Sequence, residues 1–121
     1  MNTAIWICQF FLAIIFLYSG AMKSTQSEHW LVAHKQTGVE GLPVPFIRFI
    51  GISEILGVIG ILIPSFTGIL PVLTPVAAVC FAVIMVFAAR IHYRRNEMQS
   101  VALNVIILCV SLFVAFERFT M

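Results

Sequence analysis

The sequence predicts an all-α integral membrane protein, a four-helix bundle that forms a single transmembrane domain over residues 1–121. Two observations support this fold class, the composition and four long apolar runs. Apolar residues make up 61% of the chain and charged residues only 10%, whereas about a quarter of the residues in a soluble domain are charged. So few charges cannot cover a surface that faces water. We therefore expect the lipid bilayer as the surroundings of the chain, and no nucleic-acid partner.

Each apolar run is close to the roughly 20 residues that a helix needs to cross a bilayer. Backbone groups in hydrocarbon must be paired within the protein, so helices are expected, and the two-residue alternation of an outer-membrane barrel is absent. The expected helices cover about residues 4–22, 46–63, 71–89 and 100–116. Prolines mark the breaks, because Pro43 and Pro45 precede the second run, Pro64 is expected to end it, and Pro71 and Pro75 open the third.

The longest connection, residues 24–45, has room for a short interfacial helix. Thr25 and Glu28 have the spacing of a capping box, in which two side chains satisfy the first backbone donors of a helix. Trp30 and His34 could then belong to the apolar side of that helix, at the membrane surface.

The distribution of basic residues predicts the orientation. Six of the seven Lys and Arg residues lie in or beside loops 23–48 and 90–99, and the seventh is Arg118 near the C-terminus. Loops rich in Lys and Arg stay on the cytoplasmic side of a membrane. We therefore expect a multi-pass protein of the cell membrane, the inner membrane where there are two, with both loops in the cytoplasm and both termini outside.

A charged residue within a membrane helix is costly and therefore a candidate for function. Glu54 lies eight residues beyond Phe46, which places it about 12 Å into the bilayer at about 1.5 Å per residue. Helical side chains lean toward the N-terminus of their helix. Lys23, at the cytoplasmic end of its helix, therefore leans into the membrane, and Glu54 leans toward the cytoplasmic face, so the two side chains approach each other in depth. A structural ion pair, a protonated Glu54 and a site for a ligand or proton all remain open.

Other polar side chains are expected in the same half of the bundle. The candidate ligand-binding residues are Glu54, Lys23, Asn104, Arg48, Arg90 and His92. Arg90 and His92 could instead reach phospholipid headgroups, and Asn104 could join two helices by a hydrogen bond. The small residues expected at helix contacts are Gly20, Gly51, Gly57, Gly60, Ala78 and Ala82.

The remaining reactive side chains argue against redox or metal chemistry in the isolated chain. Cys8, Cys80 and Cys109 are dispersed and form no C-x-x-C pair. His29 and His34 are five residues apart, so on a helix they point in different directions, and no metal site is expected. There is no flavin or nucleotide motif, so we expect no intrinsic cofactor and can assign no catalytic residue.

Several motifs together resemble the DoxX-like family of small four-helix membrane proteins. They are Phe16-x-x-Ser19-Gly20-x-x-Lys23, an Arg-x-x-Gly-x-x-Glu-x-x-Gly segment from Arg48 to Gly57 that continues to Pro64, Leu73-Thr-Pro75-x-Ala77-Ala78, His92 and Asn104. The resemblance spans nearly the whole chain. It implies functional polar positions at Lys23, Arg48, Glu54 and Asn104. It also implies links to quinone-dependent sulfur oxidation, to quinone stress or to the assembly of membrane receptors.

Two classes of function follow from these observations. The first is binding of a lipophilic small molecule, a quinone or a lipid, with Glu54 and Lys23 on its polar head, within a redox-linked membrane subunit. The second is a non-catalytic accessory or assembly subunit that binds a membrane protein partner or another copy of itself. A proton-coupled small transporter is disfavoured, because the carboxylate of such transporters lies on the first helix, which here carries none.

Overall fold

The computed structural model describes residues 2–34 and 36–120, and this part of the chain is helical without strands. The four long helices are α1 (Asn2–Thr25), α3 (Val44–Thr67), α4 (Leu73–Arg94) and α5 (Met98–Phe119). Each is long and apolar enough to cross a membrane, which confirms the predicted fold class. A short helix, α2 (Glu28–Ala33), and a 3-10 turn, η1 (Thr37–Val39), occupy the longest connection. Lys35, one of the six basic residues in the charge count, lies outside the described residues.

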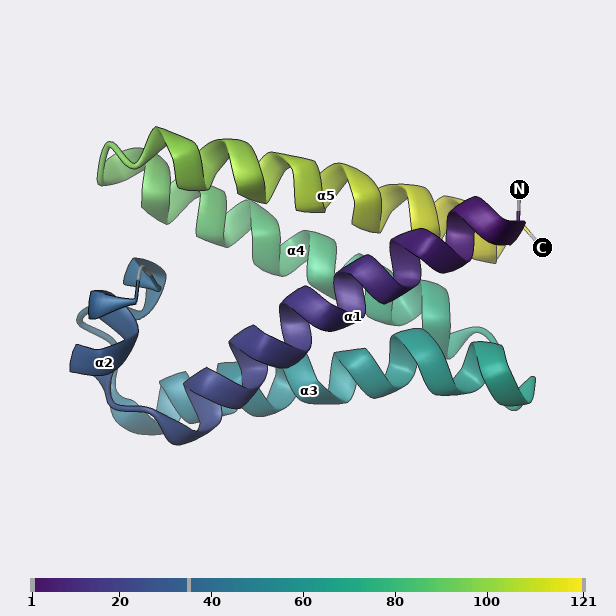
Figure 1. Ribbon diagram of the computed structural model, residues 1–121, viewed down its shortest axis with the longest axis horizontal. Helices are drawn as coiled ribbons and strands as arrows, with labels where there is room; N and C mark the ends of the chain where they lie inside the picture. Colours follow the sequence, from purple (N-terminus) through teal and green to yellow (C-terminus); the bar gives the residue numbers. More distant parts are fainter. Residues whose placement is uncertain (1, 35, 121) are drawn as a thin grey trace.

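The four helices form two pairs. Figure 1 shows α1 crossing α3 and α4 running beside α5, and these two pairs make the most extensive contacts in the bundle. Both chain termini lie at one end, which we call the terminus end. The other end carries α2, η1 and the turn between α4 and α5, and we call it the α2 end. The α1–α3 pair and the α4–α5 pair separate toward the α2 end (Figure 1).

The first pair is held by a close crossing of two helix backbones. A Cβ atom on Gly51 would lie 2.7 Å from the backbone nitrogen of Ser24, and one on Gly20 would lie 2.8 Å from the carbonyl oxygen of Gly51. Neither glycine could carry a side chain without movement of the opposite backbone. Small residues allow this approach, so α1 lies directly against α3 at this point.

The two pairs meet through aromatic rings in the middle of the bundle. Phe16 of α1 stacks on Phe81 of α4, with ring centroids 3.9 Å apart and planes 3° apart. Gly57 of α3 leaves room for the Phe81 ring, and Gly60 lies against Ala77. The buried core around this stack also contains Leu12, Ala13, Val58, Ile61, Ala78, Met85, Ile107, Val114 and Ala115. Ala82 is also buried, on the same helix as Ala78.

Helix α3 does not end at Pro64, contrary to the expectation from the sequence. Proline lacks a backbone N–H, so the carbonyl of Gly60 loses its usual partner in the helix. The Oγ1 of Thr74 donates to this carbonyl at 3.1 Å, and Nε2 of Gln9 donates to the carbonyl of Ile61 at 2.7 Å. Because neighbouring helices supply these donors, α3 continues past the proline.

The other helices also extend beyond the apolar runs that predicted them. Helix α4 continues through basic residues to Arg94, and α1 begins at Asn2. Hydropathy locates the part of a helix that can lie in hydrocarbon, whereas the helix itself continues until its backbone turns. In α3 that turn comes at Gly68, which adopts a left-handed conformation with φ of 73°.

The longest connection contains a short helix, as expected, but the N-cap of this helix is not the expected one. Thr25 is the last residue of α1, and its Oγ1 donates to the carbonyl of Ala21 at 2.8 Å. The N-cap of α2 is Ser27, whose Oγ accepts a hydrogen bond from the backbone N–H of Trp30 at 3.1 Å. The Trp30 ring stacks on His34, with centroids 3.7 Å apart. The predicted capping box was wrong because α1 continues two residues further than the loop prediction allowed.

Substitution of Gly51 by alanine tests the α1–α3 crossing. We expect Gly51→Ala to lower the free energy of unfolding by about 1–3 kcal/mol, because the added methyl would push against the backbone of α1. Gly60→Ala is the matched control. Its methyl would meet the Cβ of Ala77 at 3.2 Å, and alanine is favoured over glycine in a helix by about 1 kcal/mol. Unfolding in detergent should therefore distinguish the two variants. Equal decreases in the free energy of unfolding in both variants would show that the α1–α3 crossing is no more sensitive to an added methyl group than the contact at Gly60.

Candidate functional site

Glu54 occupies the centre of the candidate site. It lies near the middle of α3 and its side chain is buried. Ser19 Oγ donates to Glu54 Oε1 at 2.9 Å, and Lys23 Nζ contacts Glu54 Oε2 at 3.3 Å. Both carboxylate oxygens are therefore bound by side chains of α1. Ser19 and Lys23 are four residues apart and lie on one helix face, on either side of Gly20 at the crossing with α3.

The contribution of Ser19 was missed by the sequence analysis. A serine in a helix commonly bonds to its own backbone, so its presence in the motif did not indicate a contact with Glu54. The available signal was its spacing from Lys23, one helical turn away. The Ser19 hydroxyl also lies 3.5 Å from Oε1 of Gln36, in the segment that follows α2. Ser19 thus connects the buried carboxylate to the loop at the α2 end.

Arg48 positions α1 rather than the carboxylate. Its Nη1 donates to the backbone carbonyls of Lys23 at 2.8 Å and Gln26 at 2.6 Å. Carbonyls at the C-terminus of a helix lack partners within the helix, and a cation there also interacts favourably with the helix dipole. Arg48 therefore caps α1 and fixes the backbone of the residue that pairs with Glu54.

His92 belongs to a separate polar cluster at the α2 end. Its Nδ1 lies 2.7 Å from Glu97 Oε1. Thr37 of η1 donates its hydroxyl to the same carboxylate oxygen at 2.7 Å. The guanidinium of Arg95 binds both oxygens of Glu40, at 3.0 and 3.4 Å, and its Nε lies 3.3 Å from Glu97 Oε1. We call these five residues, which join η1 and the residue after it to the α4–α5 turn, the clasp.

Electrostatics favours the charged forms of Glu97 and Arg95. Hydrogen bonds from His92 and then Thr37 hold the pKa of Glu97 below its ordinary value, and the nearby Arg95 adds to this effect. The hydrogen bond to Glu40 raises the pKa of Arg95. A lowered carboxylate pKa stabilises the fold above the ordinary glutamate pKa, and this contribution is lost only as the pH falls through the lowered value. Both shifts favour the charged forms of Glu97 and Arg95, the two clasp residues that face each other in the α4–α5 turn.

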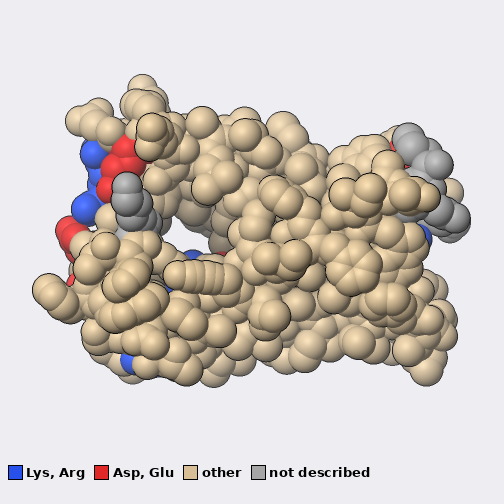
Figure 2. Space-filling view, in the orientation of Figure 1, with Lys and Arg blue, Asp and Glu red and all other residues tan. Residues whose placement is uncertain are grey.

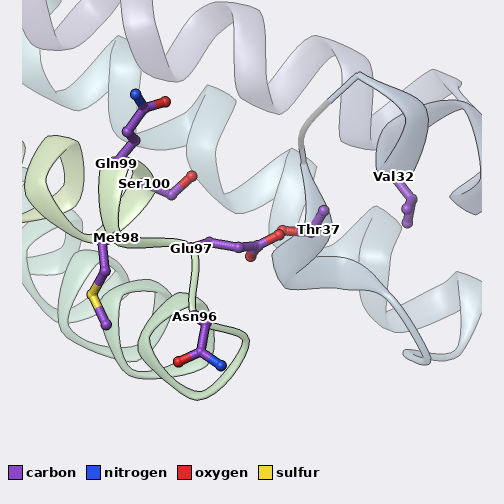
Figure 3. Close-up of a pocket in the computed structure, with 7 residues that line it drawn as sticks. All are labelled: Val32, Thr37, Asn96, Glu97, Met98, Gln99 and Ser100. Carbon is purple, nitrogen blue, oxygen red and sulfur yellow. The ribbon is translucent and has the colours of Figure 1, made fainter.

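A polar cavity of about 430 Å³ lies beside the clasp, between the α2–η1 segment and the start of α5. Figure 3 shows the side chains of Thr37 and Glu97 meeting at its edge, with Val32 on the far side and Gln99 and Ser100 at the start of α5. Glu97 is the one charged residue among the seven that line it. The cavity is thus suited to neutral hydrogen-bonding groups rather than to anions.

Asn104 lies one helical turn beyond Ser100 on α5 and is buried. Its Nδ2 has no hydrogen-bond partner among the described residues. A buried donor without a partner costs free energy, and each such group in a native structure calls for an explanation. An acceptor from a bound molecule would supply the missing partner.

A hollow separates the two helix pairs on the face seen in Figure 2. It opens between α1 and the α4–α5 pair, and blue and red atoms of charged side chains are visible inside it. Glu54 and Asn104 belong to the two different pairs. Arg90, in contrast, is exposed on α4, as expected for a side chain that reaches headgroups.

A second polar contact, at the terminus end, was also not predicted. Arg118 Nε donates to Gln9 Oε1 at 2.6 Å, and the guanidinium lies 5.3 Å from the centre of the Trp6 ring. The sequence analysis counted Arg118 as a residue of the C-terminal tail, whereas it lies in the last turn of α5. The contact joins α5 to α1. It has a structural role, distant from Glu54 along α1.

A double-mutant cycle tests the ion pair between Lys23 and Glu54. We expect Lys23→Met and Glu54→Gln to be non-additive, with an interaction free energy of about 0.5–3 kcal/mol, because the side chains are in contact. The control cycle pairs Lys23→Met with Glu117→Gln, which lies near the end of α5. Those two changes should add within about 0.5 kcal/mol. Unfolding of all variants in the same detergent gives both values, and additivity in the first cycle would contradict the pair.

One comparison with known proteins bears on the identity of the chain. The family model described as the DoxX-like family matches residues 7–114. No curated protein and no solved structure matches the chain. The matched range contains all six candidate ligand-binding residues, from Lys23 to Asn104, and it covers most of the sequence. The chain therefore belongs to the DoxX-like family.

Proposed function

We propose that this membrane protein binds a lipophilic small molecule, a quinone or a lipid, in the hollow between its two helix pairs, and that Glu54 is the polar group that receives it. The observation that carries the proposal is a fully buried carboxylate in the middle of a membrane helix, held by Ser19 and Lys23 of a neighbouring helix. Ligand sites combine mostly apolar walls with a few polar groups that fix orientation. The apolar helices around the Glu54 carboxylate, with Ser19 and Lys23 bound to it, have this combination of walls and polar groups.

The available donors favour a head group that accepts hydrogen bonds. A lysine ammonium has three donors, and Glu54 accounts for one contact of Lys23. The Nδ2 of Asn104 supplies another donor on the opposite helix pair. Carbonyl oxygens of a quinone ring or of a lipid ester would accept from both. Glu54 would accept from a hydroxyl group or exchange a proton with it.

This proposal assigns no electron transfer to the chain itself. If the ligand is a quinone, the redox centre belongs to a partner, and Glu54 handles the proton. The protein would then act as a membrane subunit linked to redox chemistry.

An accessory or assembly subunit is the second candidate, and a groove between α3 and α4 favours it. The groove has a volume of about 620 Å³, and apolar residues line it together with Gly57 and Gly60. An apolar groove on the outside of a membrane bundle could receive a helix of a partner, since membrane helices associate by close packing. On this alternative the Glu54 contact only stabilises the bundle.

Lipid analysis of the purified protein tests the first candidate. We expect mass spectrometry after gentle purification to find a quinone or lipid in the wild type. The bound amount should fall at least about tenfold in Glu54→Gln, the effect of losing roughly 1.4 kcal/mol of binding free energy. Glu117→Gln, the same chemical change elsewhere, should retain the ligand. A bare wild-type protein in a stable complex with another membrane protein would instead support the accessory subunit.

We also propose that the α2 end faces the cytoplasm and that both termini face outside. Lys23, Arg48 and the basic residues from Arg90 to Arg95 lie toward the α2 end, and Arg118 lies at the other. This asymmetry supports the orientation through the retention of basic loops in the cytoplasm.

Cysteine labelling of intact cells tests the orientation. Thr67 and Arg94 are exposed and lie at opposite ends of the bundle. In a background without native cysteines, a membrane-impermeant maleimide should label Thr67→Cys in intact cells and Arg94→Cys only after lysis. The reverse pattern would overturn the orientation.

A further inference from the structure

We infer that ligands reach the Glu54 hollow from the bilayer, between α1 and α5, and that the clasp closes the route from water at the α2 end. This inference rests on the proposed function and specifies its ligand class. The ligand would be a molecule dissolved in the membrane, not a water-soluble metabolite.

The lateral opening lies where α1 and α5 diverge. These two helices make few contacts with each other, and the Gln9–Arg118 hydrogen bond joins them at the terminus end. Toward the α2 end Figure 2 shows the hollow open between α1 and the α4–α5 pair. The outer faces of both helices are apolar, with Leu17 of α1 and Leu103 of α5 about half exposed. A bilayer around these faces would bring lipid-soluble molecules directly to the opening.

The clasp closes the route by which water would enter the hollow from the α2 end. Where the helix pairs separate, the side chains of Thr37 and Glu40 reach across to the α4–α5 turn and bind Glu97 and Arg95. Figure 2 shows red and blue atoms of charged side chains gathered at the end of the molecule next to the hollow. The clasp therefore joins the two pairs at the place where water would otherwise enter between them.

The same loop segment also touches the site itself. Gln36 immediately precedes Thr37, and its Oε1 lies 3.5 Å from the Ser19 hydroxyl that donates to Glu54. On its other side Val39 packs with Leu31 of α2 and Ile47 of α3, all three almost fully buried. The apolar contacts hold the segment on the α1–α3 pair, and the polar contacts of the clasp hold it on the α4–α5 pair.

The apolar contacts that hold the segment on the α1–α3 pair are harder to break than the polar contacts that hold it on the α4–α5 pair. The apolar anchor is buried, whereas Glu40 and Arg95 are exposed to water, where ion pairs are individually weak. Loss of the polar contacts would therefore free the α4–α5 side of the segment and leave its anchor in place. The clasp can thus open without unfolding the bundle.

A cysteine reporter tests the two routes. Ser19→Cys, in a protein whose Cys8, Cys80 and Cys109 are replaced by alanine, places a thiol next to Glu54. In nanodiscs we expect membrane-soluble N-ethylmaleimide to label it with the clasp intact. A charged methanethiosulfonate should react slowly. The double variant Arg95→Gln, Glu97→Gln should raise the charged reagent's rate about tenfold, because reaction in an opened state follows the population of that state.

Three controls make the result specific. Glu117→Gln should leave both rates unchanged, and Thr67→Cys, which is exposed at the terminus end, should react with both reagents in every background. Thr37→Val removes one hydroxyl from the clasp and should give an intermediate rate with the charged reagent if the double variant folds poorly. Elution as a single species from size-exclusion chromatography checks folding.

Each outcome decides one part of the inference. An unchanged rate with the charged reagent after both clasp substitutions would overturn the closure. Failure of N-ethylmaleimide to label the intact protein would overturn the lateral route. The labelling requires no bound ligand. A clasp-dependent rate, together with mass spectrometry that finds no quinone or lipid retained by the purified protein, would therefore refute the proposed function alone. Ligand binding with a clasp-independent rate would refute this inference alone.

Discussion

A polar group in the interior of a bilayer must find its partner within the protein, and the close crossing of α1 and α3 provides that partner for Glu54. Gly20 and Gly51 bring the two backbones together, and this places Ser19 and Lys23 within hydrogen-bonding distance of the carboxylate. Wider separation of the helices would leave Glu54 in hydrocarbon without a partner. The position of the site therefore depends on two residues that have no side chain.

The same constraint operates at the terminus end. Pro64 frees a backbone carbonyl, which Thr74 of α4 satisfies, and Gln9 of α1 binds the next carbonyl. Between the polar contacts of Glu54 and those of Gln9 and Thr74, the stack of Phe16 and Phe81 fills the middle of the bundle. The helices are thus packed tightly at the middle and the terminus end, whereas toward the α2 end, where the pairs separate, a hollow remains between them.

The features that sequence reasoning found are those that depend on one helix at a time. Apolar runs predicted the four helices, and the lean of helical side chains predicted that Lys23 and Glu54 approach in depth. Features that depend on the folded loop were missed. Arg48 caps α1 and His92 belongs to the clasp, because the described parts of the loop, residues 24–34 and 36–43, fold back over the helix ends. The continuation of α3 through Pro64 likewise depends on donors from other helices, which no local pattern contains.

The order of the helices along the chain has a consequence for insertion into the membrane. A carboxylate near the middle of a helix raises the free energy of inserting that helix by about 2.5–3.5 kcal/mol. Ser19 and Lys23 belong to α1, which is synthesised before α3. The partners that offset this cost therefore lie on a helix that leaves the ribosome before α3 does, so the chain order allows Glu54 to be paired as soon as α3 enters the membrane.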